Sequence, residues 1–470
     1  MATVSPAWIR MASAKASALL QPLVEAIATM AAALATLACT LPLAPGPGPA
    51  VLAVVLSLSL SRSQLDRDLR GRLEAAVVLP VVAFVALGVG MLLRHAPWIG
   101  AAVFVTGMFA SIWLRRFGPM ARRAGSLIAL PFVTLLTVPH IHAEPTGRLP
   151  AVVVPLLVAL LALLWVSVFH LLARRLGLQP PVQAPAQQPL ATPTESTLRP
   201  VASTRMAIQM GVALALAFVV GYLGFGQRWS WIVLTAFIVN SGNRGRLDVA
   251  FKSGLRVLGS AGGTVLAMSL SLHAGGDPTA HALLILGALF FGVWLRPFGY
   301  AWWALFVTLA LALLQGFSDS APPAAMLWLR LEEIAIGAVI GLAAAWFVLP
   351  VRSGDVLCRR LADALAALSE ALDPAVEDRN PARFAAAMAQ LEQMVTPFRA
   401  SRLLTARFRT LQPADWADAL LACRTPAIAL IAGRKTPGHV RQAVGSARKA
   451  LREPEALLPA LQRLCKSLGV

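Results

Sequence analysis

Three charged side chains open the last long apolar stretch of the sequence: Arg330, Glu332 and Glu333. On a helix, Arg330 and Glu333 share one face and can pair, whereas Glu332 points elsewhere and can titrate. Charges inside an apolar segment are costly, and they mark function when they have partners on other helices. The hypothesis is that Glu332 or Glu333 exchanges protons while Arg330 or Arg256 binds a carboxylate, which suits arginine's planar fork. An ion pair at a helix end in the membrane interface is the alternative.

A second polar group surrounds the start of an earlier apolar stretch. Lys252 and Arg256 lie one helical turn apart there, and Asn240 and Asp248 are close enough in sequence to position these cations. The group predicts an anion vestibule at the inner end of a span, with simple cytoplasmic anchoring as the alternative. Trp231 could stack on an aromatic substrate, although tryptophan at the end of a span is also typical of an interfacial belt. The predicted substrate-binding residues are therefore Arg256, Arg330, Lys252, Trp231 and Asn240.

The chain that carries these residues is far too apolar for water. Of its 470 residues, 57% are hydrophobic and 13% charged, and the mean hydropathy is +0.70. Apolar stretches long enough to cross a bilayer must form helices, because no water is present there to satisfy the backbone. This pattern predicts an all-α integral membrane protein with about twelve transmembrane helices. The predicted spans are 23–43, 49–61, 73–93, 98–114, 126–140, 149–172, 206–226, 229–241, 253–273, 279–295, 300–317 and 327–349.

An internal repeat divides these spans into two halves. Residues 113–118 read WLRRFG and residues 294–299 read WLRPFG, each near the end of the fourth span of its half. Six spans in each half make two parallel six-helix repeats. The predicted domains are a first transmembrane repeat (1–175), a Pro/Gln-rich cytoplasmic linker (176–200), a second transmembrane repeat (201–350) and a cytoplasmic basic helical domain (351–470).

The positive charges predict the orientation. The formal net charge of +19 would suggest nucleic acid in a soluble protein, but here the arginines gather in alternate loops and in the tail, as the positive-inside rule requires. We therefore expect no nucleic-acid partner, a multi-pass location in the bacterial inner (cytoplasmic) membrane, and cytoplasmic N- and C-termini. The basic faces of the tail could lie on anionic lipid, on a partner or in plain solvent.

Catalysis and metal binding find little support in the sequence. The four cysteines are widely separated and predict reduced, structural thiols with no metal site. His140, His142 and Glu144 form an incomplete ligand set. The sequence has no nucleotide-binding loop and no nucleophile with a base and an orienting group, so we expect neither a cofactor nor an enzyme.

Two backbone features predict how the helices meet. The connections 42–49 and 221–227 are rich in glycine or proline and occupy matching places in the two halves. They are either breaks that line a transport cavity or ordinary outer turns. The pairs Gly259/Gly263 and Gly337/Gly341 are spaced by four residues, which predicts close packing of helix backbones.

Four motifs in the second half carry a family resemblance. They are WSWIVLT at 229–235, NRGRLD at 243–248 with Lys252 and Arg256-x-x-Gly-x-x-x-Gly-Thr264, RPFGYAWW at 296–303 with Phe306, and Arg330-x-x-Glu333-x-x-x-Gly337. The second half resembles the membrane domain of the fusaric acid resistance family, which includes the aromatic acid exporters and is related to aluminium-activated malate transporters. The resemblance implies efflux of small organic, often aromatic, carboxylates, driven by the proton gradient. It also implies a homodimer and, in some members, a periplasmic adaptor protein.

Three functions remain open at this level. The first is a secondary transporter that exports small organic anions across the inner membrane by proton antiport. The second is a gated organic-anion channel, which the malate-transporter kinship would favour. The third is a non-transporting membrane scaffold that acts through the basic tail. All three place the protein in the lipid bilayer, and only the first two require a small organic anion.

Overall fold

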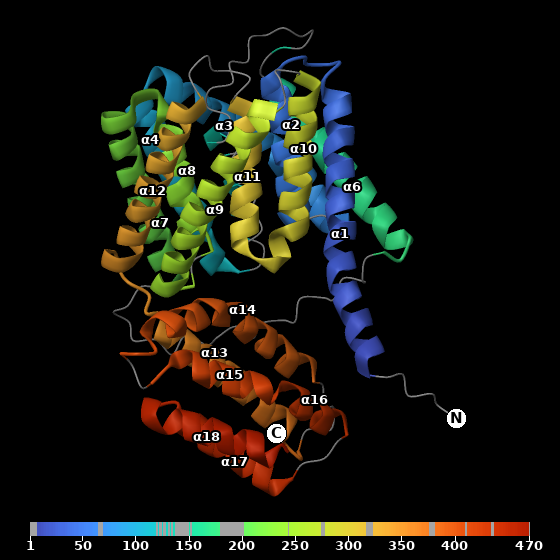
Figure 1. The fold of residues 1–470 in the computed structure, drawn as a ribbon, viewed down its shortest axis with the longest axis vertical. Coiled ribbons are helices and arrows are strands. Elements are labelled where there is room, and N and C mark those ends of the chain that lie inside the picture. The colour runs from blue at the N-terminus through green and yellow to red at the C-terminus, as the bar shows by residue number, and fades with distance from the viewer. Residues whose placement is uncertain are drawn as a thin grey trace. The chain divides into compact units, whose positions relative to one another are not determined.

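The computed structural model consists of helices and turns throughout the part of the chain that it describes (Figure 1). This part comprises residues 7–63, 69–118, 150, 153–178, 202–242, 244–273, 278–315, 323–375, 381–408, 411–433 and 437–469, with scattered residues between 121 and 136. These residues form two compact units. Unit 1 is made of the described residues within 1–182, 200–241 and 252–349, and unit 2 of those within 242–251 and 350–470.

Unit 1 holds the apolar helices of the chain. Its helices in the first half are α1 (Ala7–Thr40), α2 (Pro47–Ser63), α3 (Leu69–His95), α4 (Pro97–Trp113) and α6 (Val153–Arg175). Its helices in the second half are α7 (Ala202–Val220), α8 (Trp229–Asn240), α9 (Arg246–His273, shared with unit 2), α10 (Pro278–Leu295), α11 (Tyr300–Gln315) and α12 (Pro323–Phe347). The fifth predicted span, 126–140, lies mostly outside the described residues.

Six helical segments are long and apolar enough to cross a membrane. They are Leu19–Thr40, Ala76–His95, Pro97–Phe117, Val153–Arg175, Ser203–Phe225 and Thr279–Phe298, and shorter apolar helices cover Gly48–Ser61, Trp229–Asn240 and Tyr300–Leu314. The prediction of an all-helical, multi-pass membrane protein is confirmed at this level. The count of twelve spans and their arrangement as two repeats remain predictions.

The WLRxFG motif ends a helix in the same way in both halves. In the first half α4 passes into a 3₁₀ turn, Leu114–Phe117, before Gly118; in the second half α10 passes into a 3₁₀ turn, Arg296–Phe298, before Gly299. Gly118 has a φ of 109°, a value that favours glycine. The same residues therefore build the same local structure at both places.

Helix α8 is the most enclosed helix of the second half. Nine of its residues are buried, which is typical of a helix that is apolar on all sides and packed on all sides. Close packing against α12 occurs at Gly337, where a Cβ atom would lie 2.8 Å from Cβ of Thr235. Helix α9 packs against α11 in the same manner, because a Cβ on Gly259 would lie 2.7 Å from the Ala301 carbonyl oxygen. The packing interpretation of both glycine pairs is confirmed.

The connection between α7 and α8 is irregular. It consists of a π-helical turn (Gly221–Phe225) and a 3₁₀ turn (Gly226–Arg228), and such π turns occur frequently at functional sites. Gly226 has a φ of 54°. The Tyr222 hydroxyl donates a hydrogen bond of 3.2 Å to the Pro97 carbonyl, which ties this connection to the start of α4.

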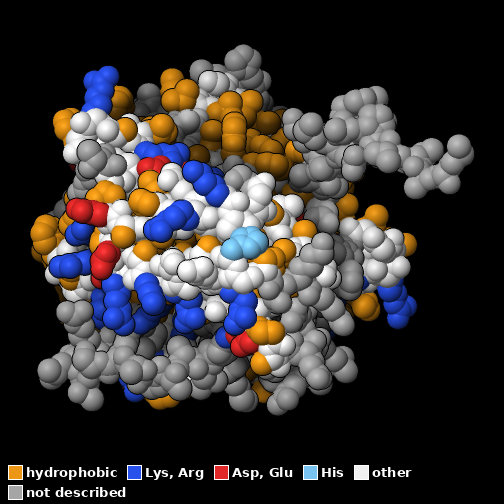
Figure 2. All heavy atoms as spheres, turned by 90° about the horizontal axis from the view of Figure 1, so that it is seen from below, with side chains coloured by type: hydrophobic (Ala, Val, Ile, Leu, Met, Phe, Trp, Pro, Cys, Tyr) orange, Lys and Arg blue, Asp and Glu red, His pale blue; other side chains and the backbone are white. Residues whose placement is uncertain are grey.

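Unit 2 is a small helical domain with its own core. It contains α13 (Ser353–Ala371), α14 (Ala382–Thr405), α15 (Pro413–Ala422), α16 (Arg424–Ala432), α17 (Gly438–Ala450) and α18 (Pro454–Ser467). Their apolar faces meet in one buried cluster that includes Leu361, Phe384 and Leu461. Lysine and arginine side chains spread over the face in Figure 2, where α17 and α18 lie. An ion-pair network joins α14 to α15, with Arg402 bonding Asp415 at 2.6 Å and Asp418 at 3.0 Å.

The cysteines of unit 2 correct one prediction. Cys423, after α15, and Cys465, in α18, form a disulfide with a Cα–Cα distance of 5.4 Å, so the prediction of reduced thiols is wrong for this pair. They are 42 positions apart in the sequence and form no local motif, so the packing of α15 on α18 brings them together. Cys358 is a free thiol. Burial, followed by the charge of Asp355, raises its pKa, so it stays protonated and unreactive.

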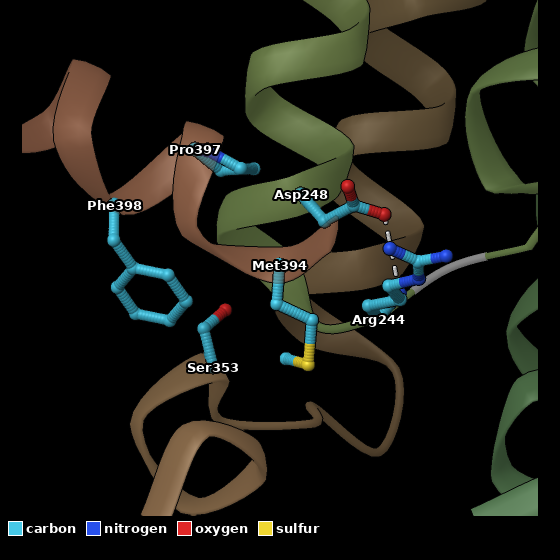
Figure 3. Close-up of a pocket in the computed structure, with 6 residues that line it drawn as sticks. All are labelled: Arg244, Asp248, Ser353, Met394, Pro397 and Phe398. Atoms are coloured by element: carbon cyan, nitrogen blue, oxygen red, sulfur yellow. Dashed lines mark hydrogen bonds between the residues drawn. The ribbon is translucent and has the colours of Figure 1, made fainter. Parts of the chain in front are cut away.

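The first turn of α9 belongs to unit 2. Ser353 accepts the Leu247 backbone N–H at 2.9 Å, and the Arg244 guanidinium donates bonds of 2.8 and 3.1 Å to the backbone carbonyl and side-chain oxygens of Gln393. Asp248 accepts the Arg244 backbone N–H at 3.2 Å. Figure 3 shows the small pocket that Arg244, Asp248, Ser353, Met394, Pro397 and Phe398 line. Its volume of about 10 Å³ suits one water molecule and excludes an organic anion.

Candidate functional site

A polar stripe runs along one face of α9. Ser253, Arg256, Ser260 and Thr264 follow at spacings of three and four residues, and they are 7%, 1%, 0% and 2% exposed. This spacing places all four on one helix face, over about 16 Å of helix length. The Ser260 hydroxyl lies 3.0 Å from the Thr308 hydroxyl of α11. Among the described residues, no partner is found for the hydroxyls of Ser253 and Thr264.

Arg256 is the most unusual member of this stripe. Its guanidinium is buried, and its Nε and Nη2 atoms have no hydrogen-bond acceptor in the described part of the chain. Tyr300 of α11 lies within electrostatic range. An isolated cation in an apolar interior carries a desolvation cost of several kcal/mol unless an anion compensates it. Nε and Nη2 form one edge of the guanidinium, and this edge binds both oxygens of a carboxylate side by side.

A second charged group lies at the start of α8. Arg330 of α12 stacks over the Trp231 ring, with 5.3 Å between Cζ and the ring centroid. Glu333, also of α12, is 1% exposed and faces Arg228 at 3.5 Å. Glu332 is exposed. Of the two glutamates proposed from the sequence, only Glu333 therefore lies inside the protein with cations around it.

The third group lies at the other end of α8. Asn240 is 5% exposed. Its side-chain N–H donates to the Ala236 carbonyl at 3.1 Å, whereas its Oδ1 has no partner among the described residues. The Lys252 ammonium points back toward the Ser241 carbonyl at 3.5 Å. The Lys252 ammonium and the Asn240 amide therefore lie near the N-terminal part of α9, the helix that carries Arg256.

Arg256 and Arg330, the two arginines predicted as alternative carboxylate-binding residues, lie in different places in the structure. Trp231, under Arg330, and Asn240, beside Lys252, are nine residues apart on α8, or about 13 Å along the helix axis. Arg256 lies one turn beyond Lys252. The two arginines belong to two separate groups, with Arg256 on the α9 stripe and Arg330 beside Trp231 and Glu333.

Several residues of these groups escaped the sequence analysis. Arg228 was missed because it stands in a connection rather than in a span, and its pairing with α12 is visible only in three dimensions. The stripe had a signal in the sequence, namely small hydroxyl residues in helical steps around Arg256. Trp231 is 6% exposed, whereas Trp302, in the RPFGYAWW motif, is 48% exposed. No cluster of metal-ligating side chains occurs among the described residues.

Fold and site together define a class of protein: a multi-pass, all-helical membrane protein with buried charges on the faces of its helices, as in membrane transporters. Residues 212–344, which run from α7 to α12 and include Arg256 and Arg330, match the family described as fusaric acid resistance protein-like. The resemblance noted in the sequence is thereby confirmed, while kinship with aluminium-activated malate transporters stays a prediction. No curated protein matches the chain.

Proposed function

We propose that this protein is a secondary transporter that exports small organic anions, in particular aromatic carboxylates, across a bacterial inner membrane. In this proposal twelve spans form two parallel repeats, and both termini and unit 2 lie in the cytoplasm. The observation that carries the proposal is the buried Arg256 guanidinium, whose Nε and Nη2 edge meets no acceptor among the described residues. An edge of this kind is complementary to a carboxylate.

The three polar groups give the anion a route. It enters from the cytoplasm past Lys252 and Asn240, which attract it and offer hydrogen bonding. It then binds the Nε and Nη2 edge of Arg256, on the face of α9 that also carries Ser260, whose hydroxyl lies 3.0 Å from that of Thr308 on α11. At the outer end it meets Arg330, where the Trp231 ring beneath the guanidinium offers an aromatic acid a surface to stack on.

Glu333 couples this movement to protons. The Glu333 carboxylate and an arriving anion compete for the same cations, Arg228 and Arg330. An anion that reaches these arginines from the cytoplasm therefore favours uptake of a proton by Glu333 from outside. The anion then leaves outward, and the proton leaves to the cytoplasm when the site returns. This order of events is an antiport cycle.

Proteoliposomes with an imposed pH gradient and a panel of aromatic carboxylates test the proposal. We expect accumulation of the anion on the acidic side, which corresponds to the periplasm. Glu333→Gln and its exposed neighbour Glu332→Gln form a matched pair of variants. We expect Glu333→Gln to remove the pH dependence of transport and Glu332→Gln to keep it. Wild-type pH dependence in both variants would remove the coupling role from Glu333.

A gated organic-anion channel is the second candidate, because a continuous polar face on α9 also suits passive permeation. A channel would carry current down the anion gradient with no proton requirement. Voltage-clamped bilayers separate the two candidates: large dissipative currents at equal pH support the channel and contradict the exporter.

A further inference from the structure

A second buried polar network lies in the first half of the chain, away from the groups described above. His170 of α6 is 8% exposed, and Thr29 of α1 is 2% exposed. The Ser61 hydroxyl of α2 joins them, at 3.1 Å from Nε2 of His170 and 2.6 Å from the Thr29 hydroxyl. Helices α1, α2 and α6 all pack on one another, so three helices contribute one side chain each to this contact.

A second set of buried hydroxyl groups lies further along α1 and α2. The Ser57 hydroxyl, one turn before Ser61 on α2, lies 3.2 Å from the Thr36 hydroxyl. The Thr40 hydroxyl, one turn beyond Thr36 on α1, donates to the Thr36 carbonyl at 2.7 Å. Ser57, Thr36 and Thr40 are 0%, 0% and 1% exposed. Thr29 and Thr40 are about 16 Å apart along α1, and the two sets of buried hydroxyls lie on the same pair of helices.

Packing alone does not account for this choice of residues. Serine and threonine often satisfy themselves on the carbonyl one turn earlier, and Thr36 does so on Ala32. A buried histidine differs from these hydroxyl residues, because the imidazole changes charge near neutral pH. A charged form of such a group inside a membrane costs free energy. In the sequence, His170 stands in a span that is otherwise almost entirely apolar, with Ser167 one helical turn before it.

We propose that His170, with Ser61 and Thr29 as its relay, is a proton-binding site of the first half. This inference rests on the proposed proton-coupled export and adds a protonation site besides Glu333. When neutral His170 accepts at Nε2, Ser61 donates its proton to that nitrogen and accepts a proton from Thr29, and a hydronium ion from the aqueous phase supplies a proton to Thr29. One proton is thereby added to the imidazole, the hydronium ion becomes water, and each hydroxyl ends with the proton count at which it began. Reversal of the same steps releases the proton.

Charged side chains lie near the network on α1, α3 and α6. On α6, Arg174 donates to the His170 backbone carbonyl at 3.3 Å, and Arg175 is exposed. Glu25, one turn before Thr29 on α1, is exposed as well, and Arg72 of α3 is half-buried. The side chains of Arg62 on α2 and Glu74 on α3 lie outside the described residues.

The test uses the full chain in proteoliposomes, with His170→Gln, Ser61→Ala and the exposed-histidine control His95→Gln. We expect His170→Gln to keep anion exchange at equal pH within about twofold and to lose the proton-gradient-driven accumulation. Ser61→Ala should slow proton uptake, read with a pH-sensitive dye, several-fold. His95→Gln should match the wild type. Unchanged gradient-driven accumulation in His170→Gln would overturn the inference and leave the anion exporter standing.

A second measurement keeps the inference testable if the wild type transports none of the carboxylates offered. Nuclear magnetic resonance of protein labelled at its histidine rings follows the protonation of all seven histidines. We expect a titrating signal that disappears in His170→Gln and shifts in Ser61→Ala. A His170 ring that does not titrate between about pH 5 and pH 8 contradicts the inference whatever the substrate.

Discussion

Replacement of Arg256 separates a binding role from a structural one. In Arg256→Gln the carboxylate loses two charge-assisted hydrogen bonds, from Nε and Nη2, whereas in Arg256→Lys the charge remains and the two-point contact is lost. Removal of one partner of a buried charged contact costs about 2–5 kcal/mol, and about 1.4 kcal/mol corresponds to tenfold in affinity. We expect anion affinity to fall about 100-fold in Arg256→Gln and about tenfold in Arg256→Lys.

Stability should move in the opposite sense. Because Nε and Nη2 of Arg256 have no acceptor among the described residues, the guanidinium without a bound anion costs desolvation energy and gains little in return. Arg256→Gln without substrate should therefore be as thermally stable as the wild type, or more so. Addition of a carboxylate should raise the melting temperature of the wild type and leave that of Arg256→Gln unchanged.

The assay is binding and thermal unfolding of detergent-purified protein across a series of carboxylates. Arg94→Gln, at an exposed position near the end of α3, is the matched control and should behave as the wild type in both measurements. Wild-type affinity in Arg256→Gln would refute the anion role. A loss of stability of about 3–5 kcal/mol would show that Arg256 belongs to an intact buried pair, and this would refute the reasoning from its unsatisfied edge.

Three further predictions concern packing, the disulfide and topology. Gly263→Leu should abolish folded protein in a gel-filtration assay, because a Cβ there would overlap the Leu305 carbonyl, whereas Gly287→Ala meets no atom within 4 Å and should be tolerated. Replacement of Cys423 and Cys465 by alanine should lower the free energy of unfolding of unit 2 by about 4 kcal/mol, the chain-entropy value for a closed loop of this length, and unchanged thermal unfolding would contradict a formed bond. Cysteines introduced into the connection 62–72 should resist membrane-impermeant labels in intact cells, and labelling from the periplasm would reverse the proposed orientation.

Sequence was sufficient for the class of fold and for the family of the second half. Long apolar segments in lipid must form helices to satisfy their backbone hydrogen bonds. The glycine pairs that begin at Gly259 and Gly337 predict close packing of helix backbones. The partners of the charged groups could not be predicted from the sequence to the same extent. The spacing of Arg330 and Glu333 suggested a pair on one helix, yet the structure adds Arg228 from another element as the ion partner of Glu333.

Contacts between distant segments explain the remaining differences. Cys423 and Cys465 carry no local motif, so only the folded helices of unit 2 reveal their bond. His170 lies in a mostly apolar helix, α6, and its contact with Ser61, 109 residues away, is not visible in the sequence. Periodicity and composition report what one helix does by itself. They do not report which side chain of another helix lies opposite.

Helix α8 is short, and outward movement of an anion has an electrical consequence. Its 12 residues make a helix of about 18 Å, against a hydrocarbon core of about 30 Å. Charged groups lie near both its ends, so the interval along α8 between them is shorter than the hydrocarbon core. In the proposed export, an anion that crosses the membrane outward gains about 2.3 kcal/mol for every 100 mV of negative interior potential. A membrane potential of about 100 mV would thus by itself support about a 50-fold outward concentration gradient of a monovalent organic anion.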